Sequence, residues 1–292
     1  MDELFGLPVT ARMIETNGIR LHAVEAGAGP LVLLLHGFPD FWYGWRHQLA
    51  ALAAFGHRAV ALDMRGYHRS DKPAGVPAYR LDALSDDVAG AIEALGERDA
   101  VVVGHDWGGI VAWHTALRHA ARVRRLVILN APPPLPLLAN PVPPDQVLRS
   151  WYVGAFQLPV VPELAMRTGG FAALKRVLRA ETTEALTDTD LARYEAAWRE
   201  PGALTAMVNY YRALAWFGPL DGALALGKQR GYAGPTLVLW GERDAALSAD
   251  LSEPAPDRVP DARIVRYPNA RHWVHWDEAE DVNRELAAFL AG

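Results

Sequence analysis

The sequence predicts an α/β protein in which a mostly parallel central sheet carries helices on both faces. Short apolar runs alternate with helical patterns through the first 131 residues, which is the order of elements in a parallel sheet. The pattern stops over residues 132–230 and resumes with apolar runs at 236–240 and 263–267. Polar side chains stand just past six predicted strand ends: His36, Asp63, Asp106, Asn130, Asp244 and His272.

The composition is that of a globular protein, and it excludes several classes of function. The 292 residues are 51% hydrophobic and 22% charged, and a net charge of -5 gives no electrostatic reason to bind nucleic acid. The chain has no cysteine, which excludes disulfides, thiolate catalysis and cysteine-based metal sites. The N-terminus is not that of a signal peptide, and no stretch approaches the ~20 apolar residues of a membrane span. We therefore expect a cytoplasmic protein without a membrane partner.

The first part of the chain supplies a hairpin and four buried strands. The hairpin is predicted because Asn17-Gly18, a strong turn signal, separates two strand-like runs. The four apolar runs that predict buried strands are residues 31–35, 59–62, 101–103 and 126–129. The segments that fit helices beside them are residues 45–55, 81–95 and 110–117.

The interval 132–230 predicts a helical insertion that covers the carboxyl edge of the sheet as a lid. Prolines cluster at its start, and no buried strand follows them. Its predicted helices are residues 145–157, 171–180, 188–198 and 203–217. The core would then comprise residues 1–131 and 231–292, and a helix over residues 279–290 would close the chain.

The turn Gly104-His105-Asp106-Trp107-Gly108 is the stretch around which the core is organised. It lies between the apolar run 101–103 and the helix that follows. A nucleophile with small residues two positions before and two positions after it, between a strand and a helix, is the nucleophile-elbow pattern. The residue at the tip is Asp106, so the predicted nucleophile is a carboxylate rather than a hydroxyl group.

Two later residues complete a predicted catalytic triad. A nucleophile needs a base, and the base needs a group that orients it. Asp244 follows the strand 236–240, and His272 follows the strand 263–267. The chain order of nucleophile, acid and histidine is that of α/β-hydrolases.

Together these motifs resemble those of the α/β-hydrolases in the epoxide hydrolase and haloalkane dehalogenase group, and the epoxide hydrolase branch most closely. The resemblance spans the whole core and therefore most of the chain. The matching stretches are His36-Gly37-Phe38-Pro39, Asp63-Met64-Arg65-Gly66-Tyr67, Ser70-Asp71-Lys72-Pro73, Gly104 to Gly109, Gly241 to Asp244 and His272-Trp273. His68 and Pro133 depart from the family pattern, which commonly has Gly and His at these places.

The resemblance implies a hydrolysis in two steps without a cofactor. Asp106 would displace a leaving group from a saturated carbon and form an alkyl ester. Water activated by His272, which Asp244 orients, would then attack the carbonyl carbon of that ester. The backbone N–H groups of Phe38 and Trp107 would form the oxyanion hole.

Two lid motifs imply that the substrate is an epoxide. The stretches Asn209-Tyr210-Tyr211-Arg212 and Trp151 to Gln157 resemble the lid motifs of epoxide hydrolases, which places Tyr152 and Tyr211 as the two phenols that hold the epoxide oxygen. The expected reactants are a small apolar epoxide and water. The expected pocket residues are His36, Pro39, Trp151 and Phe156, with His36 also shaping the oxyanion loop through hydrogen bonds. No metal site is expected, and the sequence leaves monomer and homodimer open.

Two alternatives remain at this point. A haloalkane or haloacid dehalogenase would use the same Asp106, although haloalkane dehalogenases usually have Asn where this chain has Phe38. Haloacetate dehalogenases carry arginines just after the nucleophile, where Trp107, Ile110 and Trp113 stand here. The second alternative is a ligand-binding protein with an α/β-hydrolase fold and no catalytic activity, which would have no need of the full residue set.

Overall fold

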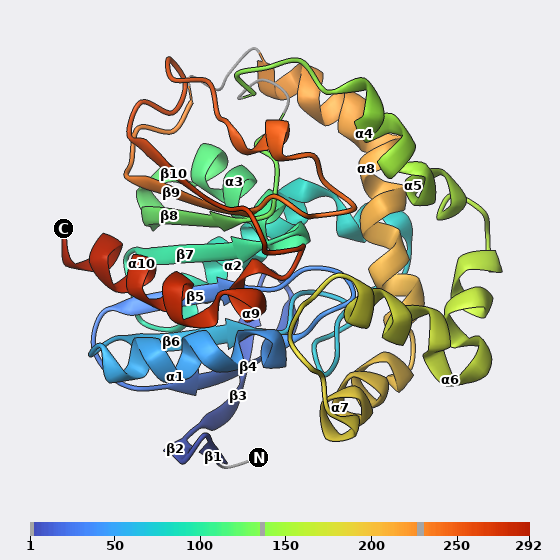
Figure 1. The fold of residues 1–292 in the computed structure, drawn as a ribbon, viewed down its shortest axis with the longest axis horizontal. Helices are drawn as coiled ribbons and strands as arrows, with labels where there is room; N and C mark the ends of the chain where they lie inside the picture. Colours follow the sequence, from blue (N-terminus) through green and yellow to red (C-terminus); the bar gives the residue numbers. More distant parts are fainter. Residues whose placement is uncertain (1–2, 135–137, 227–230) are drawn as a thin grey trace.

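The computed structural model describes residues 3–134, 138–226 and 231–292. Its centre is an eight-stranded sheet with the order β10-β9-β8-β7-β5-β6-β4-β3, and all neighbours are parallel except where β4 pairs with β3 and with β6 (Figure 1). This confirms the predicted α/β class and the mostly parallel sheet. The strands are β3 (Thr10–Thr16), β4 (Ile19–Ala26), β5 (Leu31–Leu35), β6 (Arg58–Leu62), β7 (Ala100–His105), β8 (Val123–Leu129), β9 (Thr236–Gly241) and β10 (Ala262–Tyr267). A separate two-stranded sheet pairs β1 (Glu3–Leu4) with β2 (Leu7–Pro8).

The central strands are apolar runs because helices cover the sheet on both faces. Every residue of β5, β7 and β9 is buried, as expected for parallel strands inside an α/β protein. Helices α1 (Arg46–Ala54) and α10 (Ala279–Ala291) pack together on one face, and α2 (Leu81–Ala94) and α3 (Trp107–Arg118) pack together on the other (Figure 1). The predicted hairpin joins β3 to β4 through Asn17 and Gly18, both of which have positive φ angles.

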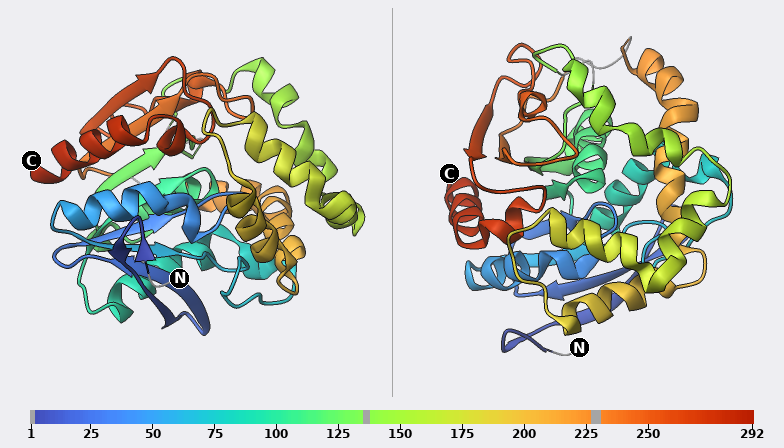
Figure 2. Two further views of the ribbon diagram at one scale, coloured as in Figure 1. Left: turned by 60° about the horizontal axis from the view of Figure 1, so that its bottom comes forward. Right: turned by 45° about the vertical axis from the view of Figure 1, so that its right-hand side comes forward.

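In the described part of the chain, five helices between β8 and β9 lie together at the edge where the parallel strands end, and we call them the lid helices (Figure 1, Figure 2). The lid helices are α4 (Pro144–Arg149), α5 (Trp151–Ala155), α6 (Val161–Ala180), α7 (Asp188–Arg199) and α8 (Ala203–Leu226). Among the described residues, no helix combines the length and apolar composition that a membrane span requires.

The lid helices differ from prediction in two places. The helix predicted over 145–157 is divided into α4 and α5 at Ser150, and the helix predicted over 171–180 begins ten residues earlier. Four residues with non-helical angles, Thr168 to Phe171, divide α6 into two helical parts. Gly169-Gly170 therefore marks a kink inside the segment, and the helical part before it was missed. One further short helix, α9 (Val274–Asp277), follows the predicted catalytic histidine.

Candidate active site

The turn between β7 and α3 has the strained geometry of a nucleophile elbow. Asp106 adopts φ 51° and ψ -121°, a combination that costs a non-glycine residue about 1–3 kcal/mol. A Cβ atom on Gly104 would lie 2.3 Å from the carbonyl oxygen of Gly108, and one on Gly108 would lie 2.1 Å from that of Leu35. The two glycines are therefore required for the turn, with Asp106 at its tip, to approach the neighbouring backbone.

The carboxylate of Asp106 is held by the two backbone groups predicted for the oxyanion hole. The N–H of Phe38 donates to its Oδ1 at 2.7 Å, and the N–H of Trp107 also hydrogen bonds to it. Burial raises the pKa of Asp106, against the opposite effects of His272 and these two N–H groups. Gly37 permits this approach, because a Cβ atom there would lie 2.3 Å from the same Oδ1.

His272 lies between the two carboxylates of the predicted triad. Its Nδ1 donates to Oδ2 of Asp244 at 2.7 Å, and its Nε2 lies 3.7 Å from Oδ2 of Asp106. Burial would lower the pKa of His272, but the charge and hydrogen bond of Asp244, with the charge of Asp106, raise it to about 9. The geometry fits a base whose outer nitrogen faces the nucleophile and whose inner nitrogen is fixed by an acid.

Asp244 is kept ionised by a set of hydrogen bonds that the sequence did not reveal. Burial would raise its pKa, but His272 and Asn130 lower it below the ordinary value. The amide of Asn130 donates to Oδ2 at 2.8 Å, and the backbone N–H groups of Ala246 and Leu247 donate to Oδ1. Asn130 stood out in the sequence only because it follows a strand. Its role depends on β8 and β9 being neighbours in the sheet.

The two predicted tyrosines come from different lid helices and lie edge-to-face, close enough to Asp106 for its charge to affect both. The rings of Tyr152 on α5 and Tyr211 on α8 have centroids 5.8 Å apart. Burial is the main cause that raises the pKa of each phenol, and the negative charge of Asp106 adds to it, so both remain protonated donors. The indole of Trp107 hydrogen bonds to the hydroxyl of Tyr211. Because an indole N–H can only donate, the proton of that hydroxyl stays available for another acceptor.

Aromatic rings close around this pair of phenols. Phe156 lies edge-on to Tyr211 at 4.9 Å and to Phe38 at 5.6 Å between ring centroids, so the structure places it beside the phenols, and its role in the pocket stays a prediction. Trp151 does not take its predicted place, because its side chain is 72% exposed. Helix α5 instead turns the adjacent Tyr152 towards Phe156 and Tyr211.

The other two predicted pocket residues build the loop after β5. His36 is fully buried: its Nδ1 donates to the carbonyl of Gly37 and its Nε2 accepts the N–H of Met64. Burial lowers its pKa to about 4, so the ring is neutral. With both nitrogens used, His36 shapes the oxyanion loop as expected and offers nothing to a ligand, which corrects its assignment to the pocket. Pro39 is buried as well, and its carbonyl accepts a hydrogen bond from Trp198 of the lid.

Comparisons with known proteins identify the family of the chain. The α/β hydrolase fold family matches residues 30–279. The AB hydrolase superfamily protein YfhM of Bacillus subtilis is 40% identical over 97% of this chain and 98% of its own length. Epoxide hydrolase 4 of Mus musculus is 37% identical over 95% of this chain and 78% of its own. The chain belongs to the epoxide hydrolase family of α/β-hydrolases. A crystal structure of Bacillus megaterium epoxide hydrolase with an inhibitor superposes with a TM-score of 0.87 and 31% identity, over 96% of this chain and 100% of that one.

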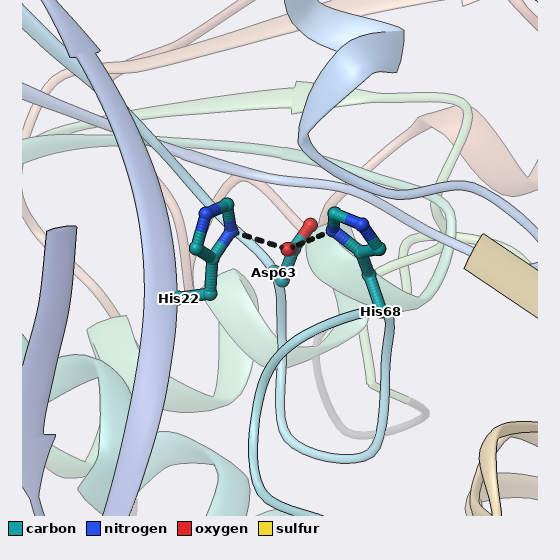
Figure 3. Close-up of side chains that lie close together, drawn as sticks. All are labelled: His22, Asp63 and His68. Atoms are coloured by element: carbon teal, nitrogen blue, oxygen red, sulfur yellow. Dashed lines mark hydrogen bonds and ion pairs between the residues drawn. The ribbon is translucent and has the colours of Figure 1, made fainter. Parts of the chain in front are cut away.

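In this member of the epoxide hydrolase family, His68, which departs from the family pattern, has a hydrogen-bond partner in the core. His68 and His22 both direct Nδ1 to Oδ2 of Asp63, at 2.7 Å and 2.6 Å (Figure 3). Oδ1 of Asp63 accepts the N–H of Trp42 at 2.9 Å, beyond the oxyanion loop. The bond to Asp63 accompanies a φ of 41° at His68, a conformation that usually selects glycine.

These three side chains are also the one group with the composition of a metal site in the described part of the chain. A histidine that binds a metal through one nitrogen normally donates its other N–H to a neighbour. Nε2 of His22 is buried without a hydrogen-bond partner. The contacts therefore fit two histidine N–H groups that donate to one carboxylate rather than a metal site. Through Asp63, these bonds join the turn after β6 to β4 and to the segment after the oxyanion loop.

Proposed function

We propose that the enzyme opens a small apolar epoxide with water through an ester on Asp106, and that the lid helices supply the groups that activate the epoxide oxygen. The observation that carries this proposal is the position of two protonated phenols, Tyr152 and Tyr211, within the field of the Asp106 carboxylate. Phe38, Phe156 and Trp107 add an apolar lining around them.

In the first step, Oδ2 of Asp106 attacks an epoxide carbon and the bond from that carbon to the ring oxygen breaks. The oxygen leaves as an alkoxide, which is a poor leaving group unless it receives a proton or a strong hydrogen bond. Tyr152 and Tyr211 supply that hydrogen bond, and one of them transfers its proton. The product of this step is a hydroxyalkyl ester of Asp106 and a tyrosinate.

In the second step, His272 takes a proton from water and the hydroxide attacks Cγ of Asp106. Negative charge develops on Oδ1, which already lies 2.7 Å from the N–H of Phe38. The bond from Cγ to the alkyl oxygen then breaks and releases the diol. The two protons of the water end on that alkyl oxygen and on the tyrosinate, so that the enzyme returns to its starting state.

Formation of the ester also prepares His272 for its role as a base. In the free enzyme the charge of Asp106 helps to raise the pKa of His272 to about 9, which favours the imidazolium form. Alkylation removes that charge, and the pKa of His272 falls. Alkylation of Asp106 therefore favours the neutral form of His272, which the next step needs as a base.

A dehalogenase would share Asp106, His272 and Asp244, and it is the second candidate. A halide leaves as a stable anion and needs no proton, so a pair of protonated phenols, Tyr211 buried and Tyr152 partly buried, favours the epoxide. Assay of halide release and diol formation with the purified enzyme distinguishes the two. Halide release in the absence of any diol would overturn the proposal.

The two-step scheme is tested by trapping the ester. The His272→Gln variant, mixed with styrene oxide and analysed by intact mass, should gain the mass of one epoxide, with the adduct on the peptide that contains Asp106. The Asp106→Asn variant is the control and should gain none. If wild type produces diol while His272→Gln forms no adduct, the covalent route is refuted.

A further inference from the structure

Helix α7 of the lid contacts the oxyanion loop through three side chains spaced four residues apart. Asp190, Tyr194 and Trp198 lie on one face of the helix, because residues at this spacing stack above one another. The segment that they contact follows β5 and comprises residues 39–43, directly after the oxyanion donor Phe38. Helix α7 lies at the end of the lid nearest the N-terminal strands (Figure 1, Figure 2).

Each of the three side chains makes one hydrogen bond to this segment. The indole N–H of Trp198 donates to the carbonyl oxygen of Pro39 at 2.6 Å. The hydroxyl of Tyr194 donates to Oδ1 of Asp40 at 2.8 Å, and that of Tyr43 donates to Oδ1 of Asp190 at 2.7 Å. The helix and the segment therefore run past each other in opposite directions, and contact is made along two turns of the helix.

The two contacts nearest to Phe38 are buried. Trp198 is 2% exposed and Tyr194 is fully buried, so water does not replace their hydrogen bonds when these are lost. A capping box at Thr187 and Asp190 fixes the start of α7, which holds its contact face in register. Helix α7 thus holds its hydrogen-bonding side chains in fixed positions against the loop.

The oxyanion donor lies inside a turn that is held from both sides. The N–H of Asp40 donates to the carbonyl of Gly37 at 3.0 Å and closes a turn around Phe38 and Pro39. His36 holds the start of this turn through its bonds to Gly37 and Met64. On the other side, the carbonyl of Pro39, the residue after Phe38, accepts the hydrogen bond from Trp198 of the lid.

We propose that Trp198 is a positioning residue for the oxyanion hole, and that α7 couples the lid to the geometry of the Phe38 N–H group. This inference rests on the proposed function, because it assigns the oxyanion hole to hydrolysis of the Asp106 ester. Trp198 acts through Pro39 and does not touch the reacting atoms.

The role of Trp198 has a kinetic signature that general destabilisation lacks. The Phe38 N–H binds Oδ1 of Asp106 in the resting enzyme, and it is needed most when Oδ1 becomes an oxyanion during ester hydrolysis. A displaced N–H therefore slows hydrolysis, while alkylation by Asp106 is affected little. The ester should accumulate during turnover.

The Trp198→Phe variant keeps an aromatic ring beside Tyr194 and Phe171 and removes the indole donor. Single-turnover quench experiments with styrene oxide would measure ester formation and ester decay separately. We expect ester decay to slow about tenfold, less than the ~10²–10³ that follows loss of an oxyanion donor. Ester formation should stay within about twofold of wild type, and the ester should become the main enzyme species at steady state.

Trp276→Phe is the matched control. Trp276 is also buried, and its indole donates to a backbone carbonyl, that of Gly44, at 2.7 Å, outside the turn around Phe38. This variant should keep the wild-type ratio of ester formation to ester decay. Tyr194→Phe, which removes the bond to Asp40, should slow ester decay in the same direction as Trp198→Phe.

The inference is overturned if Trp198→Phe keeps the wild-type ratio of the two rates, or if both rates fall equally. If Trp198→Phe does not fold, Tyr194→Phe decides, and an unchanged ratio there overturns the inference. Failure of the proposed function looks different, because wild type itself would then show no ester on Asp106 under the same quench conditions.

Discussion

Replacement of Asp106 by Asn should lower the pKa of His272 by about two to three units. The amide has nearly the shape of the carboxylate but carries no charge, so it reproduces the electrostatic effect of alkylation. In wild type, Nε2 of His272 lies 3.7 Å from Oδ2 of Asp106, and the pKa of His272 is raised to about 9. Asp244 remains in place in the variant and continues to orient the ring.

The magnitude follows from the distance between the two charges. At 3.7 Å and an effective dielectric constant of ~20, two unit charges interact by about 4.5 kcal/mol. Since one pKa unit corresponds to about 1.4 kcal/mol, this interaction is worth about three units. The pKa of His272 in Asp106→Asn should therefore lie at about 6 to 7, where half or more of the imidazole is neutral at pH ~7.

The measurement is an NMR titration of the histidine ring protons and nitrogens. His272→Gln identifies the resonance, and intact mass confirms that the introduced asparagine has not been hydrolysed back to aspartate during the titration. Asp82→Asn is the control, because Asp82 pairs with His114 on the other face of the sheet and should leave the pKa of His272 unchanged. If the pKa of His272 stays near 9 in Asp106→Asn, the nucleophile does not control the base, and the proposed release of His272 by alkylation is wrong.

Three further predictions concern the lid, the elbow and the oxyanion loop. Tyr152→Phe or Tyr211→Phe should each slow ester formation by about 10–100-fold, and the double variant by far more, since each phenol donates to a developing alkoxide; equal rates in all three variants would contradict this. Gly108→Ala should destabilise the fold in urea unfolding, because its Cβ would meet a backbone oxygen at 2.1 Å, whereas Gly154→Ala, with open space around it, should not. Burial raises the pKa of Asp40 from 3.8 to about 7. Between pH 3.8 and about pH 7 the folded state therefore keeps a proton on Asp40 that the unfolded chain has lost, so the free energy of unfolding falls as the pH rises. Over that pH range the free energy of unfolding of wild type, measured by urea titration, should fall by about 4 kcal/mol relative to that of Asp40→Asn. Parallel plots of this free energy against pH for the two proteins would contradict the raised pKa.

The sequence predicted the core because its signals are local. A strand such as β5 is buried on both faces, so its five residues are all apolar and identify it without reference to any partner. The ends of parallel strands meet at one edge, which is why the order of the strands along the chain was enough to place Asp106, Asp244 and His272 together. The first part of α6 was missed, because the helix was predicted to begin at residue 171, just after Gly169-Gly170, whereas those residues form a kink inside a longer helical segment.

The contacts between the lid and the core could not be predicted in the same way. Trp198 and Pro39 are 159 residues apart, and whether they meet depends on the angle at which α7 packs on the core. The exposure of side chains on α5 also depends on how that helix packs. Trp151 and Tyr152 are adjacent in the sequence, yet the rotation of α5 exposes Trp151 and turns Tyr152 towards Tyr211. Motif resemblance identified Tyr152 but carried no information about this rotation.

The arrangement of the lid helices suggests why one insertion serves both chemical steps. In the proposed mechanism, helices α5 and α8 bring the phenols that act when the epoxide opens, while α7 holds the loop whose N–H group acts when the ester is hydrolysed. A lid displaced as a unit would therefore impair both steps, whereas a change confined to the Trp198 contact would impair only the second. The two rates, measured separately, report on different helices of the same lid. Variants that alter the α5–α8 contact should change ester formation, and variants of the α7 face should change ester decay.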